Sequence, residues 1–355
     1  MQKSFPLFNL PYVVLSKTIR MLNPTELTYL ALSTRKSYKI VKFLKIKNPN
    51  MSIGISCSKY ADVIVETEKM EKFLVFEVLR ENELDYSDPR IRYLNFGNSV
   101  IPVMKSYPAN LTVFWGSDTF LAVQKLSEFV SELFEIPIRK LCLSNENRKN
   151  DPRRIIDWLR SRDETLKSCY FECYNTNGTE LEYFLDNLKI TTNFHMKVET
   201  TKGFRYNFKN PLEIDIVDIA ASKWLTIANL NQLNSRELEM PGTKFTNLEV
   251  NRFLRNWIGG LNSRLQYLSV GTELINIDQI IDGINVRRRA HFSTMRYFYR
   301  NNRSISFQYS INIVNNAGKV ASILYDDRQT HVDNEFIMVV WPDWKGRQSP
   351  IRAFN

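Results

Sequence analysis

The sequence predicts an α/β protein, in which a small N-terminal segment of three helices precedes an irregular leucine-rich-repeat-like α/β domain that ends in a β-hairpin. Apolar residues recur at helical spacing in the first forty-odd residues, strand-like and helix-like runs alternate after them, and residues 304–325 alternate about a turn. With 355 residues, the chain can bury a core large enough for one or two domains beyond the N-terminal segment.

The N-terminal segment carries start and stop signals for three helices. Pro11 suits the first turn of a helix, because its missing N–H would have no partner there. The apolar stripe of this helix comprises Val14, Leu15, Thr18, Ile19 and Leu22. Asn23 can cap a second helix with Pro24 at its first position and Glu26 completing a capping box. Ser33 is predicted to cap a third helix that runs to residue 44.

This segment is too short to bury its apolar surface by itself, so part of it should face the rest of the chain or a partner. It is also strongly basic. Residues 1–48 contain nine lysines and arginines and one glutamate, a net charge of +8 out of +10 for the whole chain. A basic helical surface suits an acidic partner, although a solvated basic face would look the same in the sequence.

The order of residues from Leu10-Pro11 to Leu32-Ser33 resembles the F-box, over residues 5–48. The resemblance implies that the three helices dock on a Skp-type adaptor, which links them to a cullin ubiquitin ligase. It implies fold or adaptor-contact roles for Leu10, Pro11, Val14, Leu15, Ile19, Leu22, Pro24, Leu27 and Leu30. A helical hairpin that only packs on the domain behind it is the alternative.

Residues 60–200 form an α/β repeat-like segment in this interpretation, continuous with the domain at 210–341. Predicted strands in the body of the chain cover residues 91–96, 111–115, 138–143, 166–174, 236–240 and 265–270. Predicted helices cover residues 119–134, 152–160, 180–188, 247–258 and 277–284. Several strands share the form Leu/Ile-x-x-Leu-x-apolar, which is typical of leucine-rich repeats, but the spacing is irregular. A degenerate repeat array and a layered α/β domain both fit.

A second resemblance lies in residues 210–341. The blocks Asn-Arg-Phe-Leu-Arg-Asn-Trp-Ile-Gly-Gly at 251–260 and Leu-Gln-Tyr-Leu at 265–268 resemble the type-2 F-box-associated domain of a large nematode F-box family. Locally, Thr246 is expected to cap a helix that Gly259-Gly260 ends. Its predicted buried side consists of Leu248, Phe253, Leu254 and Trp257.

The C-terminal part predicts a hairpin from 304–314 to 319–325 and a last strand at 336–341. Cysteine usage does not indicate a disulfide framework. If residues 166–174 form a strand, Cys169, Phe171 and Cys173 share one face as core residues. We expect no metal site and no cofactor, because a second pair of ligands is missing from the sequence.

An arginine-rich stretch needs a separate interpretation. Arg287, Arg288, Arg289, Arg296, Arg300 and Arg303 interleave with Phe292, Tyr297, Phe298 and Tyr299. Arginines beside stacking aromatics can bind single-stranded nucleic acid. We favour a helix-to-strand segment with core aromatics and solvated or paired arginines, since no recognisable nucleic-acid module surrounds it. The first five arginines remain candidate contacts to an acidic target protein or another anion.

The sequence contains no phosphate-cradling Gly-rich loop, no nucleophile elbow and no paired-histidine motif. No apolar run approaches a membrane span, and the N-terminus does not resemble a signal peptide. We therefore expect a non-catalytic, intracellular adaptor that binds a Skp-type adaptor and a cullin at one end and an unknown target protein at the other. A nucleic-acid-binding module at 287–303 and an F-box scaffold outside ubiquitination are the alternatives.

Overall fold

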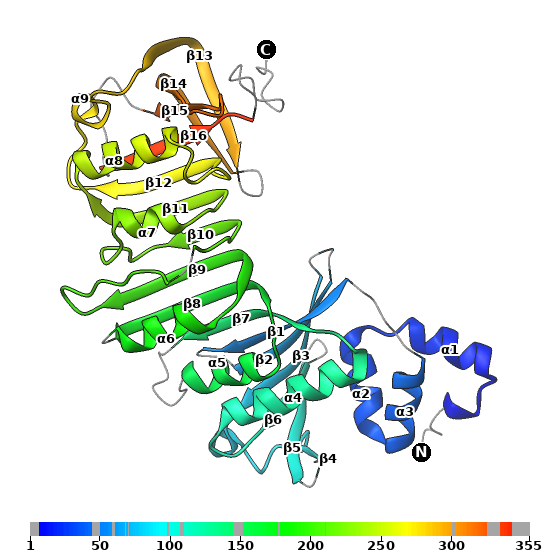
Figure 1. Cartoon of the computed structure of the whole chain (residues 1–355). Coiled ribbons are helices and arrows are strands. Elements are labelled where there is room, and N and C mark those ends of the chain that lie inside the picture. Colours follow the sequence, from blue (N-terminus) through cyan, green and yellow to red (C-terminus); the bar gives the residue numbers. More distant parts are fainter. Residues whose placement is uncertain are drawn as a thin grey trace. The chain divides into compact units, whose positions relative to one another are not determined.

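The computed structural model describes residues 7–44, 50–58, 61–67, 69, 71–97, 99–106, 110–144, 152–176, 178–209, 211–299, 303–324 and 334–342. The chain divides into two compact units, Met1–Leu166 and Lys167–Asn355. Both mix helices and strands, as Figure 1 shows. Several predicted features fall outside the described residues: Phe5, Pro6, residues 45–48, Arg300 and Tyr325.

The N-terminal helices fit the prediction. A short 3-10 turn, η1 (Leu7–Asn9), leads into α1 (Tyr12–Arg20), α2 (Pro24–Ser33) and α3 (Arg35–Phe43). The Asn23 side chain accepts a hydrogen bond from the Glu26 N–H and the Glu26 carboxylate accepts one from the Asn23 N–H, so the predicted capping box is confirmed.

The predicted cap of the third helix is wrong by one residue. Ser33 still belongs to α2, and its hydroxyl donates to the Leu30 carbonyl. Thr34 has the extended backbone of an N-cap, and its hydroxyl accepts from the Ser37 N–H at 3.0 Å. Both residues can cap a helix, so only the backbone conformation distinguishes them.

Helices α2 and α3 are fixed onto the rest of the first unit. The Thr25 hydroxyl donates to the carbonyl of Leu74, and the Tyr29 hydroxyl donates to that of Asn110 at 2.6 Å. Lys42 of α3 forms an ion pair of 2.6 Å with Glu132. These contacts join helix surfaces to two strands and to a helix of the same unit, so the N-terminal helices are part of one compact body.

The first unit contains a sheet with the strand order β7-β1-β2-β3-β6-β5-β4. Its strands are β1 (Met51–Cys57), β2 (Ala61–Thr67), β3 (Lys72–Leu79), β4 (Arg92–Phe96), β5 (Ser99–Ser106), β6 (Asn110–Phe114) and β7 (Ile138–Ser144). A 3-10 turn, η2 (Glu81–Glu83), and the helices α4 (Thr119–Phe134) and α5 (Pro152–Ser161) complete it. The β1–β7 and β3–β6 pairs are parallel and the others are antiparallel. Helix α4 packs on β1, β2 and β3 and caps at Asp118.

Two carboxylates face each other in this sheet. Asp62 of β2 lies opposite Glu77 of β3 in the antiparallel register. Burial, and to a smaller degree the Glu77 charge, raises the pKa of Asp62 to about 6. An aspartate in an unfolded chain titrates near pKa ~3.9. The folded state therefore holds this proton more tightly, and the stability that Asp62 contributes is lost as the pH rises through about 6.

The Asp62→Asn variant is expected to have a higher free energy of unfolding than the natural chain at neutral pH. The gain is about 1–2 kcal/mol after allowing for the partial exposure of the side chain. The gain should vanish below about pH 4, because Asp62 is then protonated in both states. Urea unfolding at neutral pH and below about pH 4 measures this difference in the free energy of unfolding. The exposed Asp157→Asn in α5 is the control, with an expected change under about 0.5 kcal/mol. A variant equally stable to the natural chain at both pH values would contradict the prediction.

The second unit has the strand order β8-β9-β10-β11-β12-β16-β15-β14-β13. Its strands are β8 (Leu166–Thr176), β9 (Ile190–Thr200), β10 (Ile216–Ile219), β11 (Glu237–Phe245), β12 (Tyr267–Thr272), β13 (Arg287–Tyr299), β14 (Arg303–Val314), β15 (Val320–Leu324) and β16 (Glu335–Val340). Its helices are α6 (Thr179–Asn187), α7 (Ile227–Gln232), α8 (Asn247–Ile258) and α9 (Ile277–Ile280). Strands β9 to β12 are parallel, and β12, β16, β15, β14 and β13 are antiparallel neighbours.

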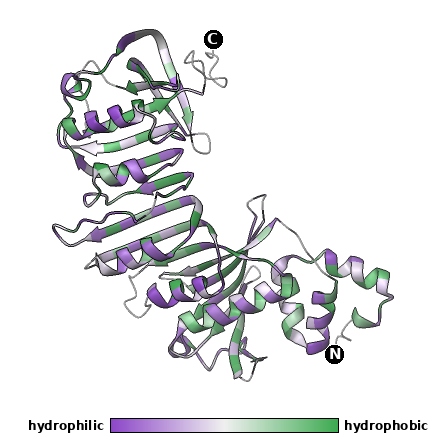
Figure 2. Cartoon of the chain, viewed as in Figure 1, coloured by the Kyte–Doolittle hydropathy of each residue, from purple (hydrophilic) through white to green (hydrophobic). Residues whose placement is uncertain are grey.

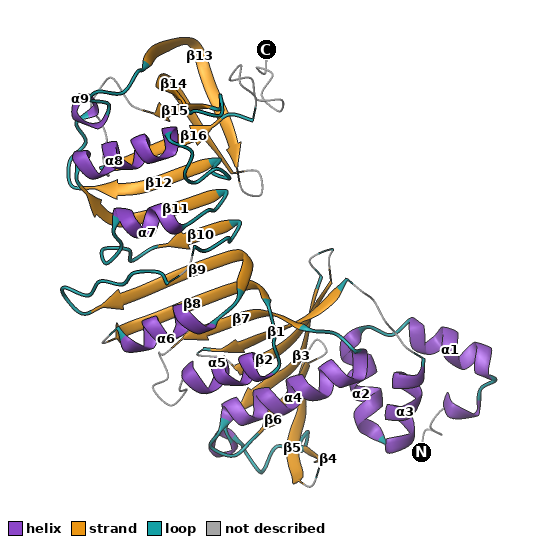
Figure 3. Cartoon of the chain, viewed as in Figure 1, coloured by secondary structure: helices purple, strands orange, loops and turns teal. Residues whose placement is uncertain are grey.

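Helices α6, α7 and α8 lie over one face of the parallel strands (Figure 3). The residues beneath them form a buried row across neighbouring strands, Phe194, Val217, Leu238 and Leu268. Cys169, Phe171 and Cys173 of β8 are also fully buried, which confirms their predicted core role, and Phe171 stacks on Phe184 of α6 with ring centroids 4.0 Å apart. The opposite face is half-exposed at β9 and β10, where His195 and Asp218 lie, and buried at β12, where Tyr267 and Ser269 lie.

Helix α8 has the predicted bounds, and Thr246 and Glu249 form a capping box at its start. Hydrophobic and hydrophilic stretches alternate along its ribbon (Figure 2). Phe253, Leu254 and Trp257 are buried as predicted, but Leu248 is 68% exposed. At about 100° per residue, Leu248 lies roughly 180° around the helix from Trp257, so it cannot share the buried face.

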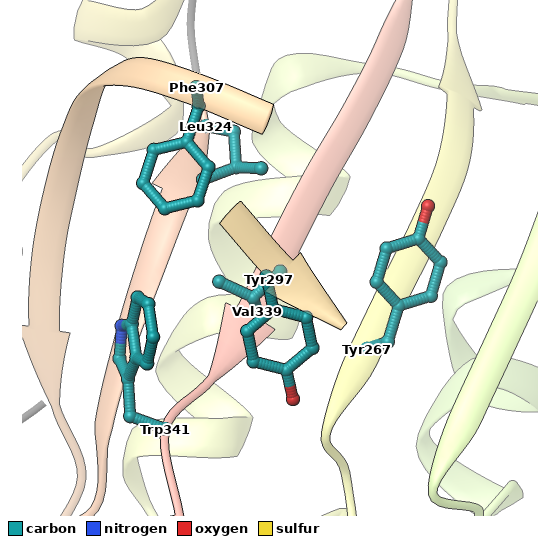
Figure 4. Packing of buried hydrophobic residues seen from close by; sticks show 6 residues of the cluster. All are labelled: Tyr267, Tyr297, Phe307, Leu324, Val339 and Trp341. Atoms are coloured by element: carbon teal, nitrogen blue, oxygen red, sulfur yellow. The ribbon is translucent and has the colours of Figure 1, made fainter. Parts of the chain in front are cut away.

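The hairpin of β13 and β14 folds back over the face opposite the helices, at β12. Tyr299 stacks on Tyr267 of β12 at 4.0 Å between centroids, and the Tyr297 hydroxyl donates to the carbonyls of Gln266 and Val340. Figure 4 shows the six buried side chains of this cluster, Tyr267, Tyr297, Phe307, Leu324, Val339 and Trp341. Tyr297 and Tyr299 of the arginine-rich stretch thus supply core contacts.

The α/β class is confirmed, but the leucine-rich-repeat-like description is not. Strands β9 and β10 are joined by a loop, later parallel strands by helices, and the C-terminal strands are antiparallel. Residues 287–299 form one strand instead of the expected helix-to-strand segment. The predicted hairpin and last strand are present as β14, β15 and β16 within the described residues. The domain limits 60–200 and 210–341 stay predictions.

Candidate partner-binding surfaces

The structure divides the nine N-terminal residues of the predicted adaptor site into three groups. Leu15, Ile19, Pro24 and Leu27 are buried; Leu10, Leu22 and Leu30 are half-buried; Pro11 and Val14 are exposed. The buried group can only hold the helices together. A partner would reach mainly the exposed pair and the accessible edges of the half-buried leucines.

Sequence periodicity missed several exposed apolar side chains of the first helix. Tyr12 and Val13 are 62% and 63% exposed in the first turn of α1, and Met21 is 85% exposed just after its end. At about 100° per residue, Val13, Val14 and Met21 fall on one side of α1 and Tyr12 falls on the other, so we call Val13, Val14 and Met21 the α1 patch. Lys17 and Arg20, both exposed, lie on the same helix. The signal that could have found the patch is the presence of apolar residues outside the buried stripe of a short helix.

A groove of about 810 Å³ lies between the start of α3, the β4–β5 hairpin and α4. Aromatic rings form part of its lining, with the Phe129 centroid 5.6 Å from that of Tyr38 and 5.5 Å from that of Phe96. The Glu128 and Glu132 carboxylates in its wall already accept hydrogen bonds from Lys125 and Lys42. Its volume is in the range of small-molecule sites, but the carboxylates in its wall are engaged in structural pairs.

The face of the second sheet opposite the helices carries a polar row. His195, Asp218, Glu239 and Ser269 stand side by side on β9, β10, β11 and β12. The His195 Nδ1 lies 3.2 Å from the Asp218 carboxylate. This row was not foreseen, because the short strand β10 was not predicted and its neighbours could not be aligned.

The polar row continues onto β8 through a network around Glu172. Its carboxylate accepts hydrogen bonds from the Tyr174 hydroxyl and from Lys197 Nζ, the latter at 3.0 Å. Hydrogen bonding from Tyr174, then from Lys197, lowers the pKa of Glu172 despite opposing desolvation. The pKa of Lys197 is raised by its hydrogen bonds to Tyr174 and Glu172. At neutral pH this network is therefore a fixed pair of opposite charges.

This row does not form a hydrolytic triad. His195 and Ser269 are separated by three strand spacings, about 14 Å, so the imidazole cannot take a proton from the hydroxyl. Ser269 instead donates to the Glu335 carboxylate. Within the described ranges, no three His, Cys, Asp or Glu side chains lie close enough to share a metal ion. No helix in the described part of the chain is long and apolar enough to cross a bilayer.

The arginine-rich stretch lies on β13, the last strand of its sheet. Arg287, Arg288, Arg289 and Arg296 are exposed, while Arg300 lies outside the described residues. Arg288 forms an ion pair of 2.6 Å with Asp278 of α9. Arg303, on β14, contacts Glu239 at 3.2 Å. Tyr297 is buried, and Tyr299 is stacked on Tyr267 with the Arg303 guanidinium 5.7 Å from its ring centroid, so these rings offer little stacking surface to a nucleobase.

The family-model comparison concerns the region that contains β10, α7, β11, α8 and most of β12, and the comparison with known proteins extends over most of the chain. Residues 204–270 match a family model described as F-box associated. The chain is similar to the Skn-1 dependent zygotic transcript 15 protein of Caenorhabditis elegans, with 20% identity over 290 residues that cover 79% of this chain and 83% of that protein. No solved structure matches the chain. The second unit therefore contains an F-box-associated domain at residues 204–270.

Proposed function

We propose that this chain is the target-recognition subunit of a Skp–cullin–F-box ubiquitin ligase. The observation that carries the proposal is the F-box-associated match at 204–270 downstream of three helices whose order of residues resembles the F-box. In this arrangement the N-terminal helices bind a Skp-type adaptor, the adaptor connects to a cullin, and the second unit holds a target protein.

The geometry of α1 supports the first of these contacts. The α1 patch presents three exposed apolar side chains, Val13, Val14 and Met21, on the side of α1 that also carries Lys17 and Arg20. Apolar residues flanked by cations suit a partner with an apolar cleft and an acidic rim. The rest of the helical segment is fixed to the first sheet, so the patch is held in place before a partner arrives and loses little conformational freedom on binding.

The chain itself performs no chemistry in this proposal. It acts inside the cell by raising the effective concentration of a bound target near a ubiquitin-carrying enzyme. An F-box scaffold outside ubiquitination would bind the adaptor equally well, and cullin binding distinguishes the two.

The Val13→Asp/Met21→Asp double variant is expected to lose co-purification with a Skp-type adaptor by about tenfold or more, because it places two charges in the apolar contact. Both positions are exposed, so the fold should be retained. The measurement is a pull-down of the full chain with adaptor and cullin, quantified against the natural chain.

The matched control is Leu248→Asp, an equally exposed apolar residue on α8 that should leave adaptor retention unchanged. Undiminished retention by the double variant would show that α1 is not the contact. If the natural chain retains the adaptor but no cullin, the scaffold role replaces the ligase role.

A further inference from the structure

The outer edge of β13 is open within the described residues. The strand pairs with β14 on one side, and the described residues form no backbone hydrogen bond with it on the other. An unpaired edge presents a row of N–H and C=O groups to which another extended chain can bind. The edge therefore offers main-chain recognition independent of side-chain sequence.

Side-chain charge gives this edge a preference. Successive residues of a strand point to opposite faces, so Arg287 and Arg289 share one face and Arg288 points to the other. Arg288 is neutralised by Asp278, whereas Arg287 and Arg289 form no ion pair within the described residues. Arg296 of the same strand is a further exposed cation without an ion pair in the described part of the chain. One side of the edge therefore carries uncompensated positive charge.

We propose that the β13 edge binds an acidic, extended segment of a target protein by strand addition. An added strand would place every second side chain beside Arg287 and Arg289, so carboxylates two residues apart would meet both guanidinium groups. The inference rests on the proposed function, since it names the target-binding surface of the same chain.

Charge selects this occupant over two others. A second copy of the chain pairing along β13 would bring arginines against arginines, which is unfavourable. Single-stranded nucleic acid would gain from the cations but would need stacking partners, and Tyr297 and Tyr299 are used in the core. The arginines thus disfavour pairing with the β13 edge of a second copy and favour binding of an acidic strand.

The test uses the full chain and a short fluorescent peptide in which valine and glutamate alternate, followed by anisotropy at low and high salt. Arg287→Ala/Arg289→Ala should weaken binding roughly 2- to 30-fold, the range for two exposed charge pairs. The matched control, Arg288→Ala on the opposite face, should change it less. The double charge reversal Arg287→Glu/Arg289→Glu should bind a valine–lysine peptide instead.

Main-chain recognition is tested with the same peptide methylated on alternate backbone nitrogens, which keeps its charge and removes hydrogen-bond donors. Equal binding of the methylated peptide, no binding of the parent peptide, or tighter binding of an oligonucleotide would each overturn the proposal. Adaptor retention is measured on the same preparation. If the chain retains the adaptor but does not bind the peptide, the β13 site alone is overturned. If it binds the peptide but does not retain the adaptor, the ligase role is overturned and the peptide-binding edge remains.

Discussion

The Gly271→Ala variant is expected to lose about 3 kcal/mol or more of unfolding free energy, although it adds a single methyl group. A Cβ at this position would lie 2.3 Å from the Pro241 carbonyl oxygen and 2.4 Å from that of Thr243. Both obstacles are backbone atoms, which cannot rotate away as a side chain can. Gly271 thus marks a close approach of two strands.

The approach arises from an irregularity in β11. The β11–β12 register shifts between Met240 and Phe245, and the Thr243 hydroxyl donates to the carbonyls of both Met240 and Gly271. A methyl group at 271 would push β12 away and stretch these bonds. The loss would fall on the strand pair at the C-terminal limit of the F-box-associated match.

Denaturant unfolding of the full chain measures this loss, with Gly116→Ala as the control. Gly116 has no atom within 4 Å of its added Cβ, so its substitution should change stability by less than about 1 kcal/mol. Equal unfolding midpoints for Gly271→Ala and the natural chain would mean that the strands can separate without cost.

Local signals predicted the helices well. The Asn23–Glu26 and Thr246–Glu249 pairs lie three residues apart as capping boxes require, and both helices begin where these pairs place them. The two bounds of α4 and α8 were also predicted correctly. Capping is a short-range interaction between neighbours in sequence, so it can be predicted before the fold is known.

Strands without a clear period were harder to find. In β3 the run Lys-Phe-Leu-Val-Phe-Glu-Val-Leu is nearly continuous in apolar residues, which periodicity cannot assign to a strand or a helix. Strand β10 has four residues and α7 has six, too few for a period to be visible. Without β10, the alignment of His195, Asp218 and Glu239 on one face could not be predicted.

The predicted adaptor site shows the same limit at the level of single residues. The spacing of apolar residues shows which of them share a helix face. It does not show which of them are buried against the rest of the first unit. Leu27 and Val13 are both apolar. Leu27 is buried because α2 packs on β3 and α3, whereas Val13 is exposed on α1. That outcome depends on contacts distant in the sequence, such as Thr25 to Leu74.

The Leu27→Asp variant is expected to unfold the N-terminal helices, with a loss of at least about 4 kcal/mol. Leu27 is 1% exposed, so the change removes a buried side chain of a kind worth about 2–5 kcal/mol and adds an unpaired carboxylate in its place. That is a large share of the roughly 5–15 kcal/mol that stabilises a typical domain. Loss of adaptor binding by this variant would therefore report unfolding and not a missing contact.

Val13→Asp separates the two effects, since an exposed substitution should cost under about 0.5 kcal/mol while still disturbing an adaptor contact on α1. Limited trypsin digestion reads out the difference. The helices contain Lys17, Arg20, Lys36 and Lys39, which become accessible to cleavage when the segment unfolds. Rapid cleavage in Leu27→Asp but not in Val13→Asp is the expected result. Natural resistance to trypsin in Leu27→Asp would mean that the helices do not depend on this core residue, and buried and exposed positions would then have to be reassigned.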